Sequence, residues 1–158
     1  MRTLIVFYSR TGHTKKAVDT LAKLIGADLA EIRCPRYSSG LLGYLRAGVD
    51  SLTGRIPTIE ATARKASDYD LVVIGGPIWM DHPALPVRAF LRSDIKLPEK
   101  VALLVTRDRV PPEPAFAEMQ ALLPRPVVAK LALTAGGVSR GSITDEVRGF
   151  ADKLRAAA

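Results

Sequence analysis

Three hydroxyl side chains and a glycine lie close together near the N-terminus, in a segment suited to binding an anion. Ser9, Thr11 and Thr14 can each donate a hydrogen bond, and Gly12 leaves the neighbouring backbone unobstructed. The segment joins an apolar run to a helical pattern, and the N-terminus of a helix favours negative charge. The simpler interpretation is that Ser9 and Thr11 only cap that helix. We predict a phosphate-binding loop made of Ser9, Arg10, Thr11, Gly12, His13 and Thr14.

This segment differs from the commonest nucleotide-binding motifs. No Gly-Lys-Ser/Thr follows a glycine at the spacing of a P-loop, and no G-x-G-x-x-G of a dinucleotide site is present. The His, Cys and carboxylate residues also lack the spacing that is typical of a metal site. We therefore expect a phosphate-bearing ligand and no metal.

A second candidate loop follows another apolar run. Gly76 would let the backbone approach a ligand, Pro77 stiffens the chain, and Trp79 offers a flat apolar face to a planar ring. The alternative is that Trp79 is a partly buried packing residue. The candidate loop consists of Gly76, Pro77, Ile78 and Trp79.

The elements that must position these loops alternate along the chain. Strand-length apolar runs are separated by segments of helical periodicity, which favours an α/β fold with a parallel sheet covered on both faces. The strands are expected at residues 3–8, 70–75, 100–106 and 126–133, with an edge strand at 28–33. Five such units predict a doubly wound, three-layer, five-stranded parallel sheet in a single domain, residues 1–158.

Helical spacing marks the connecting segments. One helix ends at Gly26, a terminal helix includes Val147 and Phe150, and Ser142 with Asp145 resembles a capping box before it. Shorter helices are expected around residues 87–91 and 117–123. Residues 41–52 are weakly helical, and we expect an irregular exit after them.

The two loops resemble those of the flavodoxin family. Ser9-x-Thr11-Gly12-x-Thr14 after an apolar strand looks like that family's loop for the phosphate of flavin mononucleotide (FMN). Residues 72–79 and 82–91 are similar to its second FMN loop and the helix that follows, and the resemblance implies that residues 76–79 lie beside the flavin ring. The resemblance implies the strand order 2-1-3-4-5, with FMN outside the carboxyl ends of strands one and three.

The exit of the fourth strand departs from the family pattern. Thr106 and Arg107 are expected beside the cofactor, but Arg109 and three prolines follow where small residues are usual. An arginine near the flavin ring would stabilise an anionic reduced flavin. The alternative is that the two arginines are solvated or paired with Asp108 and Glu113.

For three further residues, a purely structural role is expected over a functional one. His13 either donates to the phosphate or points to solvent, and the second is favoured. His82 is expected to be a loop or packing residue. Cys34 follows a predicted strand and is expected to be a small buried hydrophobe.

Composition limits the class of protein. The 158 residues are 47% apolar, which excludes a disordered basic tail, and a lone cysteine excludes a disulfide-stapled module. No run approaches the roughly 20 apolar residues of a membrane span, and no signal segment is evident, so a cytoplasmic protein is expected. Residues 1–65 carry 11 basic and 5 acidic side chains, whereas residues 66–158 carry 12 and 11.

The net charge of +7 bears on function once the family resemblance is considered. Electron carriers of the flavodoxin family are typically acidic around the flavin, so a basic chain favours an FMN-dependent oxidoreductase. The donor would be NAD(P)H and the acceptor a quinone-like or other small molecule. Alternatives are an electron-transfer protein with a protein redox partner, or an interaction module without tight FMN binding. Nucleic-acid binding is disfavoured because the basic residues are scattered and only 6% of residues are aromatic.

Overall fold

Five parallel strands run through the centre of the molecule in the computed structural model, which describes residues 1–38 and 40–157. The strands are β1 (Thr3–Phe7), β2 (Asp28–Glu31), β3 (Leu71–Trp79), β5 (Lys100–Arg107) and β6 (Ala129–Thr134). Their order is β2-β1-β3-β5-β6. Counted along the chain without the short β4, this is the predicted order 2-1-3-4-5, so the α/β fold and its topology are confirmed.

A sixth, very short strand was not predicted. The strand β4 (His82–Pro83) turns back antiparallel on the end of β3 and pairs with Ile78 and Trp79. Met80 and Asp81 make the turn with left-handed φ angles of 49° and 69°. Ile78 and Trp79, at the end of β3, therefore pair with β4 and not with β1 or β5.

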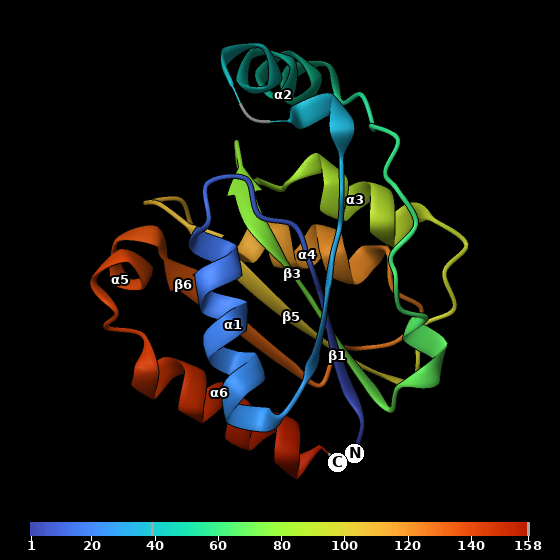
Figure 1. The fold of residues 1–158 in the computed structure, drawn as a ribbon, viewed down its shortest axis with the longest axis vertical. Helices are drawn as coiled ribbons and strands as arrows, with labels where there is room; N and C mark the ends of the chain where they lie inside the picture. The colour runs from blue at the N-terminus through green and yellow to red at the C-terminus, as the bar shows by residue number, and fades with distance from the viewer. Residues whose placement is uncertain (39, 158) are drawn as a thin grey trace.

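Helices cover both faces of the sheet (Figure 1). On one face, α1 (His13–Ile25), α5 (Ala135–Arg140) and α6 (Thr144–Ala156) bury Ile5 and Val73 of the sheet. On the other face, α3 (Leu85–Arg92) and α4 (Glu113–Ala121) bury Val72 and Ile74. Because successive side chains of a strand point to opposite faces, the unbroken apolar runs supply both cores.

One predicted helix signal is wrong. Gly26 ends α1 in the left-handed conformation, as expected, but Ser142 and Asp145 do not form a capping box. Ile143 occupies the N-cap of α6, and the Ser142 hydroxyl donates instead to the Gly137 carbonyl at 3.4 Å. Ser142 still belongs to the end of α5, whose last carbonyls need partners.

The helix α2 (Leu41–Thr53) lies apart from these layers, above the carboxyl end of the sheet (Figure 1). Its underside rests on the short helix η1 (Pro35–Tyr37). Arg36 contacts Asp50 through Nε at 2.5 Å and Nη2 at 2.9 Å, and the Tyr37 hydroxyl donates to Asp50 at 2.7 Å. The hydrogen bond from Arg36 lowers the pKa of the Asp50 carboxyl to about 2. The expected helix and irregular exit are both present, because residues 55–65 form no helix or strand.

Candidate functional site

A cavity of about 600 Å³ opens at the carboxyl ends of β1, β3 and β5. Its floor is formed by the loop after β1 and by the ends of β3 and β5, and its roof is α2. Ten of the twelve predicted site residues line it: Ser9, Arg10, Thr11, His13, Thr14, Pro77, Ile78, Trp79, Thr106 and Arg107. Gly12 and Gly76 do not. The sheet topology thus brings together three loops that are far apart in the sequence.

The loop after β1 meets the N-terminus of α1. Gly12 is the N-cap residue, at a left-handed φ of 94° that glycine adopts without strain. Ser9 accepts a hydrogen bond from the Lys15 N–H at 3.1 Å, so its side chain contributes to capping the first turn of α1. The N–H groups of His13 and Thr14 belong to the first turn and have no partner within the helix. They leave the N-terminus of α1 able to bind an anion.

Thr14 has a structural partner. Its hydroxyl and that of Thr106 lie 2.7 Å apart, and both side chains are buried. This hydrogen bond joins the start of α1 to the end of β5. The Thr14 hydroxyl is therefore engaged in fixing two loops relative to each other, in addition to lining the cavity.

His13 does not simply point to solvent, as the sequence favoured. Its Nδ1 lies 2.9 Å from the Thr11 hydroxyl, and its Nε2 lies 3.0 Å from the Ser139 hydroxyl in α5. Lys16 donates to the Ser139 carbonyl at 3.2 Å. The imidazole thus connects the loop to the neighbouring helix, and its orientation is set on both sides.

Ser139 also lies at the centre of a G-x-S-x-G sequence, Gly137–Gly141, for which the sequence alone predicts no function. In a hydrolase this motif places serine on a sharp turn between a strand and a helix. Here Ser139 lies within α5, and the far nitrogen of His13 meets a hydroxyl instead of a carboxylate. The pair therefore lacks the third group that orients the base in a nucleophilic triad.

Trp79 is held by two tyrosine rings. Its ring packs edge-on against Tyr8 at a centroid distance of 5.7 Å and against Tyr37 at 5.8 Å. The rest of the indole lines the cavity. The two interpretations of Trp79 are thus compatible, because the packing fixes the plane of the ring that the cavity exposes.

Gly76 has a packing role. A Cβ atom at this position would collide with the Val87 side chain of α3. The residue therefore allows α3 to pack closely on β3, and the approach of a ligand to its backbone stays a prediction.

Two arginines carry unused hydrogen-bond donors beside the cavity. Arg10 donates from Nη2 to the Gly40 carbonyl at 3.1 Å, and Arg107 donates from Nη1 to the Val110 carbonyl at 3.1 Å. Among the described residues, the Nε of each is buried without a hydrogen-bond partner. Buried donors of this kind ordinarily find an acceptor, so the site suits an anionic ligand.

The end of β5 and the loop after it contribute Thr106, Arg107 and Asp108 to the lining of the cavity. No ion pair found in the described part of the chain joins Arg107 to Asp108 or Glu113, which removes one of the alternatives for this arginine. Arg109 does not line the cavity. Pro112 is the N-cap of α4 and Pro114 lies in its first turn. None of the three prolines of this segment lines the cavity.

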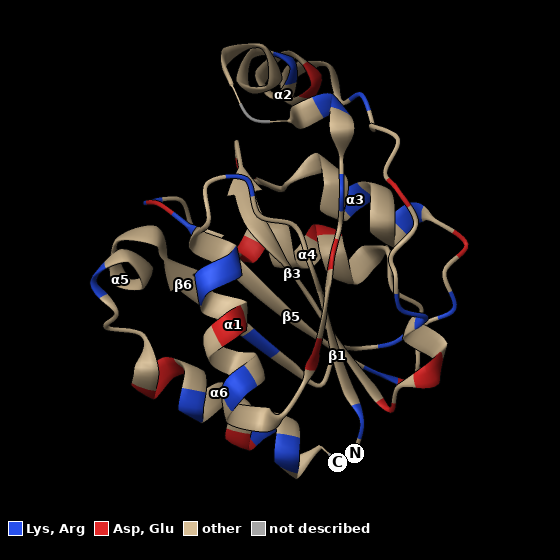
Figure 2. Cartoon of the chain, viewed as in Figure 1, with Lys and Arg blue, Asp and Glu red and all other residues tan. Residues whose placement is uncertain are grey.

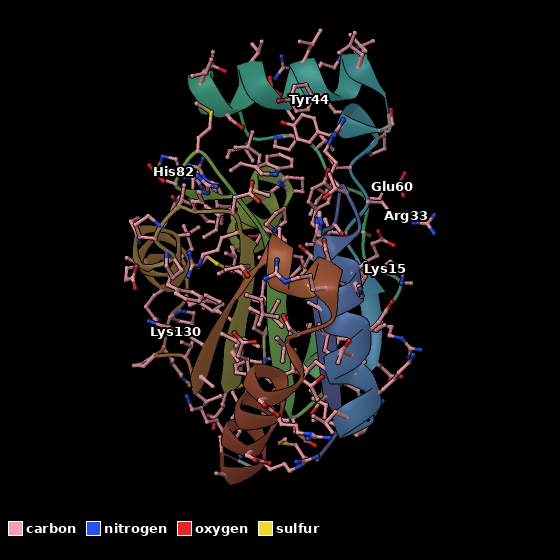
Figure 3. The ribbon with its side chains drawn as sticks, turned by 90° about the vertical axis from the view of Figure 1, so that its left-hand side faces the viewer. Lys15, Arg33, Tyr44, Glu60, His82 and Lys130 are labelled. Carbon is pink, nitrogen blue, oxygen red and sulfur yellow. The ribbon has the colours of Figure 1, made fainter. Side chains whose placement is uncertain are left out.

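The roof was missed at the sequence level. Seven α2 residues and one residue of the β3–β4 turn line the cavity: Tyr44, Leu45, Ala47, Gly48, Val49, Ser51, Leu52 and Met80. Figure 3 shows Tyr44 on the side of α2 that faces the rest of the molecule. The unusually apolar composition of residues 41–52 was the available signal, but periodicity does not say where a helix lies.

Two other residues lie outside the cavity. His82 lies in β4 instead of a loop, and its Nδ1 lies 2.6 Å from Glu118, which also contacts Arg88 at 2.6 Å. Cys34 is buried, as expected, and burial raises the pKa of its thiol. Among the described residues no three His, Cys, Asp or Glu side chains gather in a way that could hold a metal ion.

Comparisons with known proteins agree with this geometry. The family model described as flavodoxin matches residues 2–145. The chain is similar to a flavoprotein in complex with FMN from Lactobacillus acidophilus, with 23% identity and a TM-score of 0.69 over 89% of this chain and 98% of that one. The apo form of the Lactobacillus flavoprotein gives 26% identity and a TM-score of 0.64 over 82% and 91%. Oxidised Flavodoxin 2 from Bacillus cereus is 16% identical, with a TM-score of 0.65 over the whole of both chains. No curated protein matches the sequence.

Proposed function

Because the chain belongs to the flavodoxin family, we propose that it binds FMN between the floor and the roof of the cavity and acts as an FMN-dependent oxidoreductase. The observation that carries this proposal is the pair of buried, unpartnered Nε groups of Arg10 and Arg107, in the same cavity as the N-terminus of α1. The similar Lactobacillus flavoprotein is itself a complex with FMN.

The floor suits the two chemically different ends of that cofactor. The hydroxyls of Ser9 and Thr11, the first N–H groups of α1 and the Arg10 guanidinium would hold the phosphate. Trp79, Pro77 and Ile78 supply an apolar surface for the ring. Arg107 would add positive charge on the ring side. When bound, FMN supplies the redox chemistry, and the protein orients it and sets its surroundings.

A small acceptor fits this site better than a protein partner. The helix α2 covers the cavity, and the residues by which it lines the cavity are largely aliphatic. The net charge of +7 also opposes docking onto the basic partners of acidic electron carriers. We propose NAD(P)H as the electron donor and a quinone-like molecule as the acceptor, in a single cytoplasmic domain of residues 1–158.

Titration of the purified protein with FMN tests the proposal. The expected result is uptake of one FMN per chain at micromolar concentration, with quenching of flavin fluorescence. Oxidation of NADPH by the FMN-loaded protein in the presence of a water-soluble quinone then tests the reaction. Absence of any FMN uptake would overturn the assignment and favour an interaction module.

A further inference from the structure

The side of α2 that faces away from η1, called its outward face below, is apolar. Leu41 and Leu52 are each 74% exposed, Leu42 is 60%, Val49 is 58% and Leu45 is 53%. With Tyr44, α2 carries six of the ten exposed large apolar side chains among the described residues. Soluble proteins seldom gather exposed apolar residues in one place unless the patch contacts something.

The helix packs on the rest of the protein through a different side. Its buried side consists of Gly43, Ala47 and Asp50. Asp50 is held by Arg36 and Tyr37, and a Cβ at Gly43 would collide with the Ser38 carbonyl, so α2 sits directly on the backbone beneath it. This order is the reverse of an ordinary surface helix, which buries its apolar side. Figure 3 shows side chains of α2 projecting away from the body of the molecule.

Two arginines adjoin this apolar face. Arg46 lies on α2 and Arg55 follows its C-terminal end, whereas the one acidic residue of α2, Asp50, is buried against Arg36. No ion pair among the residues that the structure describes involves Arg46 or Arg55. Figure 2 shows basic residues on α2 and in the segments on either side of it. A second copy of the chain would bring the same positive charge, so the charge favours an anionic partner.

We propose that the outward face of α2 docks on the surface of an anionic phospholipid bilayer. Aliphatic side chains on one side of a helix and arginines beside them are the features of helices that lie in the membrane interface. Anionic headgroups attract each nearby arginine. The 13 residues of α2 form a convex ridge about 20 Å long, which a bilayer can accept without the complementary groove that a protein partner would need.

Docking in this way requires no membrane span, and none of the described helices is long and apolar enough to cross a bilayer. It also bears on the proposed function, although it does not depend on it. Leu45, Val49 and Leu52 lie both on the outward face and at the cavity. If the cavity binds FMN, a lipid-soluble acceptor could reach it from the bilayer along α2.

Vesicle co-sedimentation of the full chain tests the proposal. We expect binding to vesicles of phosphatidylcholine with phosphatidylglycerol, much weaker binding to phosphatidylcholine alone, and loss of binding as salt increases. Leu41→Glu/Leu42→Glu changes two exposed residues that do not line the cavity and should weaken vesicle binding roughly tenfold or more. The control is Leu24→Glu on α1, where a leucine of 37% exposure lies far along the chain from α2.

The outcomes are distinct. Failure to bind either type of vesicle, or equal binding by Leu41→Glu/Leu42→Glu, would overturn the proposal. A concentration-dependent dimer that the same variant abolishes would also overturn it and assign the face to self-association. Circular dichroism checks that the variant is folded, and FMN titration of the variant reports separately on the cofactor site.

Discussion

The floor of the cavity is built from strand ends locked into the sheet, whereas the roof is a single helix tethered beside it. Thr14 and Thr106 join two floor loops through a buried hydrogen bond, and β1, β3 and β5 are hydrogen-bonded neighbours. The roof is held by Asp50 with Arg36 and Tyr37, and by Arg10, which donates to the carbonyl of Gly40 at the N-terminus of α2. The floor is therefore a consequence of the fold, whereas the roof depends on a few side-chain contacts.

The comparison predicts that damage to the floor affects the cofactor most. Thr11→Val with Gly12→Ala removes a hydroxyl donor and places a side chain at a φ of 94°. We expect the Kd for FMN to rise well over tenfold, because each hydrogen bond to a charged group contributes about 1.5–3 kcal/mol. Fluorescence titration measures the change.

Two substitutions elsewhere provide the control. Thr20→Val removes a hydroxyl that donates within α1, and Gly149→Ala adds a methyl group on α6 with nothing within 4 Å of it. Unchanged FMN affinity in Thr11→Val/Gly12→Ala, at an unaltered melting temperature, would mean that the phosphate binds elsewhere.

Damage to the tether should loosen the roof and leave the floor intact. Asp50→Asn removes the charge that Arg36 faces, so amide protons of α2 should exchange about tenfold faster while those of β1 keep their protection. Hydrogen exchange with mass spectrometry measures this difference. Asp19→Asn, which breaks the exposed pair with Lys15, should leave both regions unchanged. Equal acceleration in α2 and β1 would show that the two regions unfold together.

The ring side of the floor should be less sensitive than the phosphate side. Trp79→Leu keeps an apolar side chain but removes the flat surface that Tyr8 and Tyr37 hold in place. We expect an increase in the Kd for FMN of about threefold to tenfold, since an aromatic pair contributes roughly 0.5–1.5 kcal/mol beyond its buried area. Isothermal titration calorimetry is suited to a change of this size. A loss as large as that of Thr11→Val/Gly12→Ala would reverse the ranking of the two ends.

Low pH should weaken the contacts that hold α2 in place. The pKa of Asp50 is about 2 in the folded protein and lies below its ordinary value, so its ionised form stabilises the fold at higher pH. This contribution is complete above about pH 4 and is lost as the pH falls towards 2. Urea unfolding followed by the fluorescence of Trp79, which contacts Tyr37, should show a smaller stability difference between the wild type and Asp50→Asn at pH 3 than at pH 7. A constant difference would exclude Asp50 as the titrating group.

The sequence was informative about the floor because its signals are local. Hydroxyl residues before a helix and glycine and proline after a strand mark loops, and parallel topology then brings those loops together. It was not informative about the roof. The spacing of residues 41–52 predicts a helix, but the position of α2 depends on contacts between Asp50 and residues 13 or 14 positions before it. The packing role of Gly76 could not be predicted either, because the close approach of the Val87 side chain from α3 is visible only in the folded structure.

A crystal structure with FMN tests the central claim most directly. The account predicts the phosphate within hydrogen-bonding distance of the loop from Ser9 to Thr14, and the ring between Trp79 and α2 in the cavity. FMN bound elsewhere, or a cavity that stays empty of FMN at saturating concentration, would contradict it.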